Sequence, residues 1–276
     1  MNTWFITGCS SGLGRGIAEA ALRRGEQVAV TARLPEKVEA FAKAYPERAL
    51  ALRLDLNDKA GVERAVQDAC DRFGKIDVLV NNAGHGYRAA IEESEPEQVE
   101  ELFNTNFFAP MELIRMILPK MRARRKGMIV NVTSIGAVRG ALGNGYYSAA
   151  KGALELATEA LAKEVKHLGI RTMLVEPGAF RTSFYDEGLK GSGASIADYD
   201  VLAAQYRKGN AVNLRKQPGD PEKGGEIIVE TALREDAPFR LLLGSDAVRA
   251  AETELEHRLT ELRAWAGVSA RSDLQR

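Results

Sequence analysis

The stretch Thr7-Gly8-Cys9-Ser10-Ser11-Gly12-Leu13-Gly14 decides how this sequence folds. It follows a short apolar run, Trp4–Thr7, and leads into an amphipathic run, Gly12–Arg24, which is the strand–turn–helix order of a phosphate-binding glycine loop. Glycines let the backbone turn sharply and approach a pyrophosphate, and the N–H groups at the start of a helix attract its charge. We expect dinucleotide phosphates to bind Gly8, Ser10, Ser11, Gly12, Leu13 and Gly14. The alternative is a tight turn without a ligand, which needs fewer glycines and hydroxyl groups.

Away from this turn, short apolar or β-branched runs alternate with longer amphipathic stretches. This alternation is typical of strand–helix–strand units, and predicts an α/β fold with a parallel sheet. The expected strands are Trp4–Thr7, Gln27–Ala32, Ala49–Leu54, Val78–Asn81, Gly127–Thr133, Arg171–Glu176 and Arg240–Leu243. The expected helices are Gly12–Arg24, Pro35–Ala44, Asp58–Phe73, Pro96–Phe103, Phe107–Arg124, Tyr147–Leu168, Pro221–Leu233 and Asp246–Trp265.

One segment, Phe180–Pro218, does not follow this alternation of strands and helices. It combines glycines with aromatic residues, and predicts a mobile insertion of the kind that forms lids or binding loops. The chain has no internal repeat and no linker that would divide it. We therefore expect residues 1–276 to form a single domain, with the insertion at about 180–218 and the last helix at about 246–265.

Composition and charge argue against several classes of function. The 276 residues are 45% hydrophobic, and 38 Lys plus Arg balance 38 Asp plus Glu, so neither nucleic acid nor a membrane is an expected partner. Cys9 and Cys70 lie far apart, and His85, His167 and His257 lack metal-ligand spacing, so we expect no metal site. No signal-like start and no run of ~18 apolar residues occurs, which predicts a soluble cytoplasmic protein.

The end of the second expected strand bears on cofactor choice. NAD-binding loops place an acidic residue there for the ribose hydroxyls, but this sequence has Arg33. A guanidinium can bind a 2′-phosphate through two hydrogen bonds, so NADP(H) is favoured over NAD(H). Arg15 or Lys37 can assist, or can be solvated helix residues. Asp55 is placed either for the adenine amino group or as an ordinary loop carboxylate or helix N-cap.

A tyrosine and a lysine indicate the chemistry. Tyr147 and Lys151 are four residues apart, on one face of an expected helix. A nearby cation favours the phenolate, so such a tyrosine can exchange a proton with a carbonyl or alcohol oxygen. Tyr146 is rotated away from the face of Lys151. Strand alternation allows only one of Thr133 and Ser134 to face a substrate, and does not decide between them.

Several further motifs occur in a fixed order. They are Thr7–Gly14, Asn81-Asn82-Ala83-Gly84, Asn106, Ser134, Tyr147-x-x-x-Lys151, Pro177-Gly178 and Thr182. With these motifs the chain resembles the short-chain dehydrogenase/reductase family over roughly Trp4–Leu243. The resemblance implies a Rossmann-like, doubly wound, seven-stranded parallel sheet and an NAD(P)-dependent oxidoreductase acting on a carbonyl or alcohol.

The resemblance also implies roles for individual residues. Ser134 would hydrogen-bond the substrate oxygen, with Thr133 facing away, and Asn106 would bend its helix and hold a water that links Lys151 to solvent. The nicotinamide side of the cofactor site would comprise Asn82, Ala83, Gly84, Tyr147, Lys151, Pro177, Gly178, Phe180 and Thr182, and the adenosine side Arg33, Asp55 and Leu56. One feature departs from the family pattern: some NADP-using members carry a basic residue where this chain has Ser11, so NADP preference depends mainly on Arg33.

The substrate and the assembly follow from the same resemblance. Loops at the carboxyl ends of the strands would form the substrate pocket, and they carry Tyr87, Arg88, Arg139, Leu142, Asn144, Phe180, Phe184 and Tyr185. The aromatic residues favour an apolar ketone or secondary alcohol, or they hold the insertion in place. Family members pair through the helices that correspond to Phe107–Arg124 and Tyr147–Leu168, so a homodimer or homotetramer is expected. The rival functions are a cofactor-sensing regulatory protein without turnover and a sugar-nucleotide epimerase or dehydratase.

Overall fold

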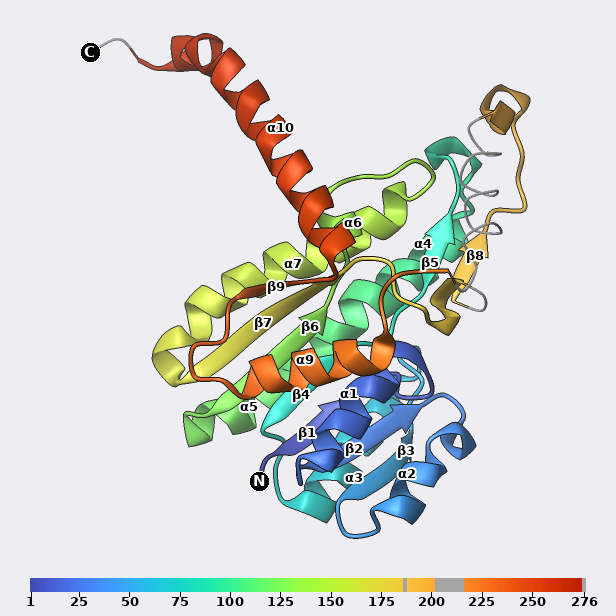
Figure 1. The fold of residues 1–276 in the computed structure, drawn as a ribbon, viewed down its shortest axis with the longest axis vertical. Coiled ribbons are helices and arrows are strands. Elements are labelled where there is room, and N and C mark those ends of the chain that lie inside the picture. Colours follow the sequence, from blue (N-terminus) through green and yellow to red (C-terminus); the bar gives the residue numbers. More distant parts are fainter. Residues whose placement is uncertain (186–187, 202–215, 275–276) are drawn as a thin grey trace.

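The computed structural model describes residues 1–185, 188–201 and 216–274. A seven-stranded sheet runs through the molecule in the order β3-β2-β1-β4-β6-β7-β9, with every pair of neighbours parallel (Figure 1). The strands are β1 (Thr3–Ile6), β2 (Gln27–Ala32), β3 (Ala49–Arg53), β4 (Val78–Asn81), β6 (Gly127–Val132), β7 (Ile170–Pro177) and β9 (Arg240–Leu243). All seven strands predicted from the sequence are therefore confirmed, as is the Rossmann-like single-domain fold.

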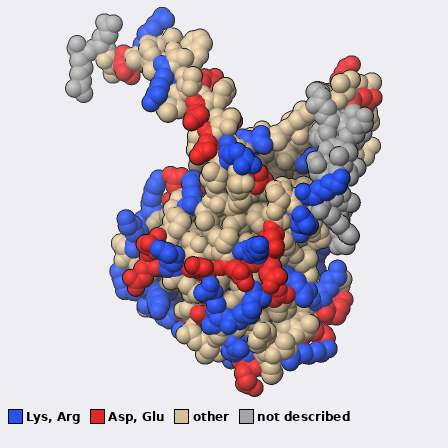
Figure 2. Space-filling model, viewed as in Figure 1, with Lys and Arg blue, Asp and Glu red and all other residues tan. Residues whose placement is uncertain are grey.

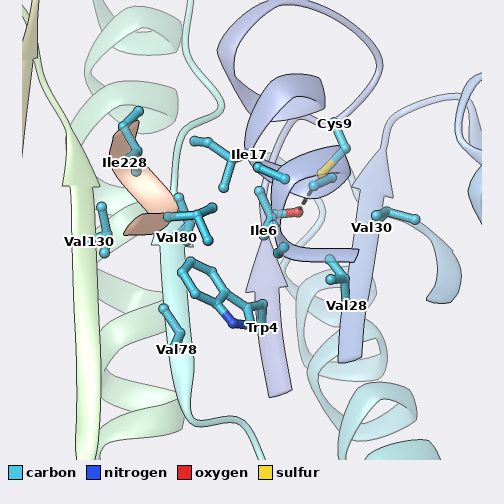
Figure 3. Packing of buried hydrophobic residues seen from close by; sticks show 14 of the residues in the cluster. Trp4, Ile6, Cys9, Ile17, Val28, Val30, Val78, Val80, Val130 and Ile228 are labelled. Carbon is cyan, nitrogen blue, oxygen red and sulfur yellow. Dashed lines mark hydrogen bonds between the residues drawn. The ribbon is translucent and has the colours of Figure 1, made fainter. Parts of the chain in front are cut away.

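Two hydrophobic clusters cover the two faces of this sheet. In one, Trp4 and Val130 of the strands pack with Ile17 of α1 (Gly12–Arg23) and Ile228 of α9 (Pro221–Leu233), as Figure 3 shows. The other cluster joins the opposite strand faces to α3 (Lys59–Phe73), α5 (Ala109–Arg124) and α7 (Gly145–Val165). Strands β1, β4 and β6 are buried along their whole length, as expected for a parallel sheet with helices on both faces.

The chain reverses its direction of winding between β1 and β4. From β1 the chain builds outward to β2 and β3, then crosses back to place β4 on the other side of β1. The crevice at the carboxyl ends of the strands at such a switch point is where open α/β sheets bind their ligands. The glycine turn follows β1 directly, so the fold places it at this crevice.

Some helices differ from their predicted limits. The predicted helix Pro35–Ala44 is a 3₁₀ turn, Pro35–Lys37, followed by a short α2, Glu39–Ala44. Five residues, Asn104–Phe108, form a π-helical segment that joins α4 (Pro96–Phe103) to α5. The π segment was not predicted, because the apolar period of one turn does not distinguish it from an α-helix. A short α6, Ile135–Val138, follows β6, and α10 (Ser245–Ser269) is longer than predicted.

A second, two-stranded sheet pairs β5 (Gly86–Arg88) with β8 (Leu189–Gly191). The insertion expected at about 180–218 thus contributes the short strand β8, while 186–187 and 202–215 of that insertion lie outside the described residues. Gly86 lies against Leu189 and Phe184, where a Cβ would be 2.6 and 2.9 Å from their side chains. Three-residue strands are too short to show an alternating pattern, so the sequence did not reveal this sheet.

Candidate active site

A cavity of about 600 Å³ lies at the carboxyl ends of the central strands. One end of it, the Arg33 end, is lined by Arg33, Lys37, Asp55 and Leu56. The opposite end, the Tyr147 end, is lined by Ser134, Tyr147 and Lys151, and the glycine turn lies between the two. The structure therefore brings the predicted phosphate-binding turn and the predicted catalytic residues to one cavity.

The glycine turn is held by its neighbour along the sheet edge. The Thr7 hydroxyl accepts hydrogen bonds from the backbone N–H groups of Asn82 and Ala83, both at 2.9 Å. In return, the Asn82 amide donates to the carbonyl oxygens of Thr7, at 2.9 Å, and Gly8, at 3.2 Å. A Cβ on Gly14 would lie 2.2 Å from the Gly8 carbonyl oxygen, so only glycine fits at position 14. The Asn82 side chain thus positions the turn, a role that its place in the motif did not reveal.

The first turn of α1 presents unused N–H groups to the cavity. Its N-cap residue, Ser11, makes no side-chain capping hydrogen bond, and the Ser11 hydroxyl is 2.7 Å from that of Ser183. No acidic residue occurs in this turn. Thr182 lies directly over it, since a Cβ on Gly12 would be 3.0 Å from the Thr182 methyl group. This arrangement of backbone donors suits an anion such as a phosphate.

At the Arg33 end, charged side chains follow β2 and β3. Arg33 is exposed, and among the described residues its guanidinium has no hydrogen-bond or ion-pair partner. Asp55 lines the cavity and accepts a hydrogen bond from the Asn57 N–H at 3.0 Å. The alternative role of Asp55 as a helix cap is excluded, because Asp58 caps α3 by accepting from the Gly61 N–H.

The two cations that were considered as assistants to Arg33 lie in different places. Lys37 lines the cavity, whereas Arg15 does not and pairs with Glu19 at 2.8 Å.

Ser134 and Tyr147 meet at the other end of the cavity. Ser134 caps α6 by accepting a hydrogen bond from the Gly136 N–H at 3.0 Å. A Cβ on Gly136 would lie 3.3 Å from the Ser134 hydroxyl oxygen and 3.4 Å from the Tyr147 ring. The two side chains therefore flank Gly136 at the cavity wall, while the Thr133 hydroxyl is buried and donates to Glu155 at 2.8 Å. Tyr146 packs against the same small apolar cluster as Tyr147 but does not line the cavity.

Lys151 and Asn106 meet in the same way around Gly84. The Lys151 ammonium donates to the Val132 carbonyl at 3.0 Å, and the Asn106 amide donates to the carbonyls of His85 and Leu102, both at 3.0 Å. A Cβ on Gly84 would lie 2.6 Å from the Asn106 carbonyl oxygen and 3.2 Å from the Lys151 nitrogen. That buried oxygen of Asn106 has no hydrogen-bond partner among the described residues. The π-helical segment thus presents a free acceptor close to the ammonium group.

Burial shifts the pKa values of both helix residues. Burial raises the pKa of Tyr147 to about 12, although the Ser134 hydroxyl and the Arg88 charge act in the opposite direction. Burial lowers the pKa of Lys151 to about 8, opposed by the charge of Glu155. The expectation that the lysine lowers the phenol pKa does not hold here, because desolvation outweighs the nearby charges. Tyr147 is therefore a neutral phenol at neutral pH.

An ion cluster lies beneath the catalytic helix. Glu155, one turn after Lys151, accepts from Arg240 at 2.8 Å, and Arg240 also binds Glu176 at 2.9 Å. Burial raises the pKa of Glu155, with Glu176 adding to the effect. These residues were not predicted, although Lys151 and Glu155 repeat the four-residue spacing of Tyr147 and Lys151.

The end of β7 and the segment that follows it form part of the cavity wall. Pro177, Gly178, Phe180 and Thr182 all line the cavity. The Gly178 N–H donates to the Leu243 carbonyl at 2.9 Å. Phe180 is also part of the main hydrophobic core, so its ring is largely buried.

The expected substrate-pocket residues divide into two groups. Arg88, Arg139, Asn144, Phe184 and Tyr185 line the cavity. The expectation is wrong for two others. Tyr87 is buried, with its hydroxyl donating to Glu95 at 2.9 Å, and the exposed Leu142 does not line the cavity. The Phe184 ring is 5.9 Å from the Tyr147 ring, so the wall near the phenol is aromatic.

Known proteins resemble both the sequence and this geometry. The sequence model of the short chain dehydrogenase family matches residues 2–190. The chain belongs to the short-chain dehydrogenase/reductase family. The family inferred from the motifs is thereby confirmed, and the protein is an NAD(P)-dependent oxidoreductase that acts on CH–OH and C=O groups.

Individual members of the family are similar to this chain over most of its length. The chain is 35% identical to Oxidoreductase BOA17 of Botryotinia fuckeliana over 250 residues, which cover 89% of each chain. It is 36% identical to 3-ketodihydrosphingosine reductase of Bacteroides thetaiotaomicron over 244 residues, covering 87% of this chain and 86% of the relative. A crystal structure of a short-chain dehydrogenase from Streptomyces avermitilis superposes with a TM-score of 0.91 at 40% identity, covering 99% of this chain and 98% of that chain.

The described residues contain neither a metal-ligand cluster nor a membrane-spanning helix. In residues 1–185, 188–201 and 216–274, no group of three or more His, Cys, Asp or Glu side chains is arranged to hold a metal ion. None of the helices in that part of the chain has both the length and the apolar character needed to cross a bilayer.

Proposed function

We propose that this short-chain dehydrogenase reduces an apolar ketone with NADPH, with Tyr147 as the proton donor. The observation that carries the proposal is the pairing at the Tyr147 end, where Ser134 and Tyr147 flank Gly136 while Asn106 and Lys151 flank Gly84. Ser134, Tyr147 and Lys151 thus line one wall of the cavity, and the buried Asn106 lies behind Gly84 beside Lys151.

The residues of the cavity suit a dinucleotide phosphate. The uncapped first turn of α1 offers N–H donors, and Arg33 and Lys37 supply positive charge at the end where a 2′-phosphate would lie. Asp55 would accept from the adenine amino group beside Leu56, and Pro177, Gly178 and Thr182 would pack against the nicotinamide. When bound, the nicotinamide supplies the hydride for the carbonyl carbon.

The remaining steps belong to the protein. The Ser134 hydroxyl would donate a hydrogen bond to the substrate carbonyl oxygen and hold it beside the Tyr147 phenol. The phenol, which is protonated at neutral pH, would then give its proton to that oxygen as the alcohol forms. The Lys151 ammonium stabilises the resulting phenolate, and the free Asn106 oxygen would hold a water that returns a proton to the site. Phe184 and Tyr185 favour an apolar substituent on the ketone.

The decisive experiment measures the oxidation of NADPH against a panel of cyclic and acyclic ketones. We expect turnover with NADPH to exceed turnover with NADH. Tight NADPH binding without turnover on any ketone would instead favour a cofactor-sensing protein.

We also infer a homodimer or homotetramer that pairs through α5 and α7. Leu156 of α7 is 70% exposed, and Phe108, immediately before α5, is 57% exposed. Burying these residues against a second copy would remove apolar surface from water. A Leu156→Glu variant should therefore show a lower mass by light scattering, and an unchanged mass would contradict this interface.

A further inference from the structure

Helix α10 leaves the body of the molecule as an arm. It starts at the carboxyl edge of the sheet and projects outward beyond α6 (Figure 1). Only Ala247 and Ala251 of this helix are buried. Arg258 donates to the carbonyl of Val138 and so ties the lower half of the arm to the body. From Leu255 to Leu274, every described residue is exposed.

An apolar stripe runs along this exposed part. Leu255, Leu259 and Leu262 follow the i, i+4, i+7 spacing of one helix face and are 56%, 44% and 64% exposed. Trp265, 61% exposed, flanks the stripe and lines a surface hollow together with Leu262. Short helices without tertiary contacts are marginal in water, and contiguous exposed apolar surface marks an interaction site. We therefore expect this apolar stripe to be buried against a partner surface.

The charges on the arm identify the kind of partner. Acidic and basic side chains both lie along the arm (Figure 2). The half nearer the body carries four acidic residues against Arg249, whereas the half from Arg258 onward carries three arginines against Glu261 and Asp273. Helices that bind anionic membranes are rich in Lys and Arg, but α10 as a whole has five acidic residues and three arginines, a net charge of −2. An antiparallel second copy would instead bring the acidic stretch of each arm against the basic stretch of the other. We propose that α10 docks antiparallel on α10 of a second copy of this chain.

The residues beside the stripe specify this direction. Glu256 and Arg263 are seven residues apart on the same flank, and neither side chain has a hydrogen-bond or ion-pair partner among the described residues. An antiparallel pair places Glu256 of one arm near Arg263 of the other, twice per dimer. A parallel pair would place Arg258 near Arg263, because residues five apart face each other across parallel helices. Like charges would then meet, which disfavours the parallel arrangement.

The first test measures mass by sedimentation equilibrium with the full-length protein. Leu259→Glu should halve the mass of the assembly, whether or not α5 and α7 form a second interface. Ala264→Glu is the matched control, since it adds the same charge on the opposite face of the same helix and should leave the mass unchanged. A monomeric wild type, or equal masses for wild type and Leu259→Glu, would overturn the proposal.

The second test asks whether the partner is another arm. Glu256→Arg and Arg263→Glu should each raise the dissociation constant of the assembly roughly fivefold, as expected for two lost ion pairs at an exposed interface. The double variant, Glu256→Arg with Arg263→Glu, should return to within about twofold of wild type. Single variants without effect, or a double variant weaker than both, would contradict antiparallel pairing. Circular dichroism of each variant verifies that the helix persists.

Discussion

At the Tyr147 end of the cavity the functional groups are buried and held by several elements, whereas at the Arg33 end they stand in solvent on single loops. Tyr147 and Lys151 are 8% and 4% exposed, and Asn106 is fully buried. Arg33 is exposed and has no partner within the described parts of the chain. Packing thus fixes the side chains proposed for catalysis before any ligand binds, whereas the exposed charged side chains at the Arg33 end would become ordered only when a ligand binds. Substitutions should therefore have large effects at the first end and modest effects at the second.

The strongest test of this difference is removal of the Tyr147 hydroxyl. Tyr147→Phe keeps the ring and its contact with Phe184 but removes the proton that the carbonyl oxygen needs. We expect kcat to fall roughly 10²- to 10⁴-fold, the usual contribution of a general acid. Steady-state NADPH oxidation measures this, with Tyr146→Phe as the matched control on the same helix. Equal losses in the two variants would show that the effect is not specific to the Tyr147 hydroxyl.

The burial of Lys151 predicts a pH dependence of stability. Its pKa is about 8 in the folded protein against an ordinary value of 10.5, so between these pH values the unfolded chain binds more protons than the folded one. The contribution of Lys151 to the free energy of unfolding should rise with pH across this window, by up to about 3 kcal/mol. Below pH 8 both states are protonated, and the cost of burying the charge is constant.

Urea denaturation of wild type and Lys151→Met at several pH values isolates this effect. The wild type should gain stability relative to the variant as pH rises from 8 to 10.5. Tyr147 and Cys9, whose pKa values are raised, oppose this trend in both proteins and largely cancel in the difference. A difference that is independent of pH would mean that Lys151 stays solvated in the folded state.

At the Arg33 end we expect a smaller effect, confined to the cofactor. Arg33→Ala should raise KM for NADPH about tenfold, equivalent to about 1.4 kcal/mol, because a charge-assisted hydrogen bond at an exposed site is lost. KM for NADH should change less than twofold. Arg15→Ala serves as the control, since Arg15 pairs with Glu19 outside the cavity. Parallel changes for both cofactors would exclude a role for Arg33 in binding the 2′-phosphate.

The sequence predicted the seven strands well because each is a short run rich in apolar or β-branched residues. Local spacing likewise led to Tyr147 and Lys151, and ordered motifs led to Ser134 and Asn106. The π-helical segment at Asn106 and the small β5–β8 sheet were not predictable, since neither produces a distinct apolar period. The use of Asn82 to hold the glycine turn, and the Glu155–Arg240 cluster, depend on contacts between residues more than 70 positions apart in the chain.

Two carboxylates near the Arg33 end provide the test with the smallest expected effects. Asp55 and Asp58 are only three residues apart, but they have different hydrogen-bond partners. Asp58 caps α3, so Asp58→Ala should lower the free energy of unfolding by about 1 kcal/mol and leave KM for NADPH unchanged. Asp55 lines the cavity and makes one exposed hydrogen bond to the Asn57 backbone, so Asp55→Ala should raise KM a few-fold with little loss of stability. Thermal denaturation and cofactor titration of the two variants measure both quantities. If Asp55→Ala lost stability without any change in KM, Asp55 would be an ordinary loop carboxylate, and cofactor binding at this end would depend on Arg33 and the glycine turn alone.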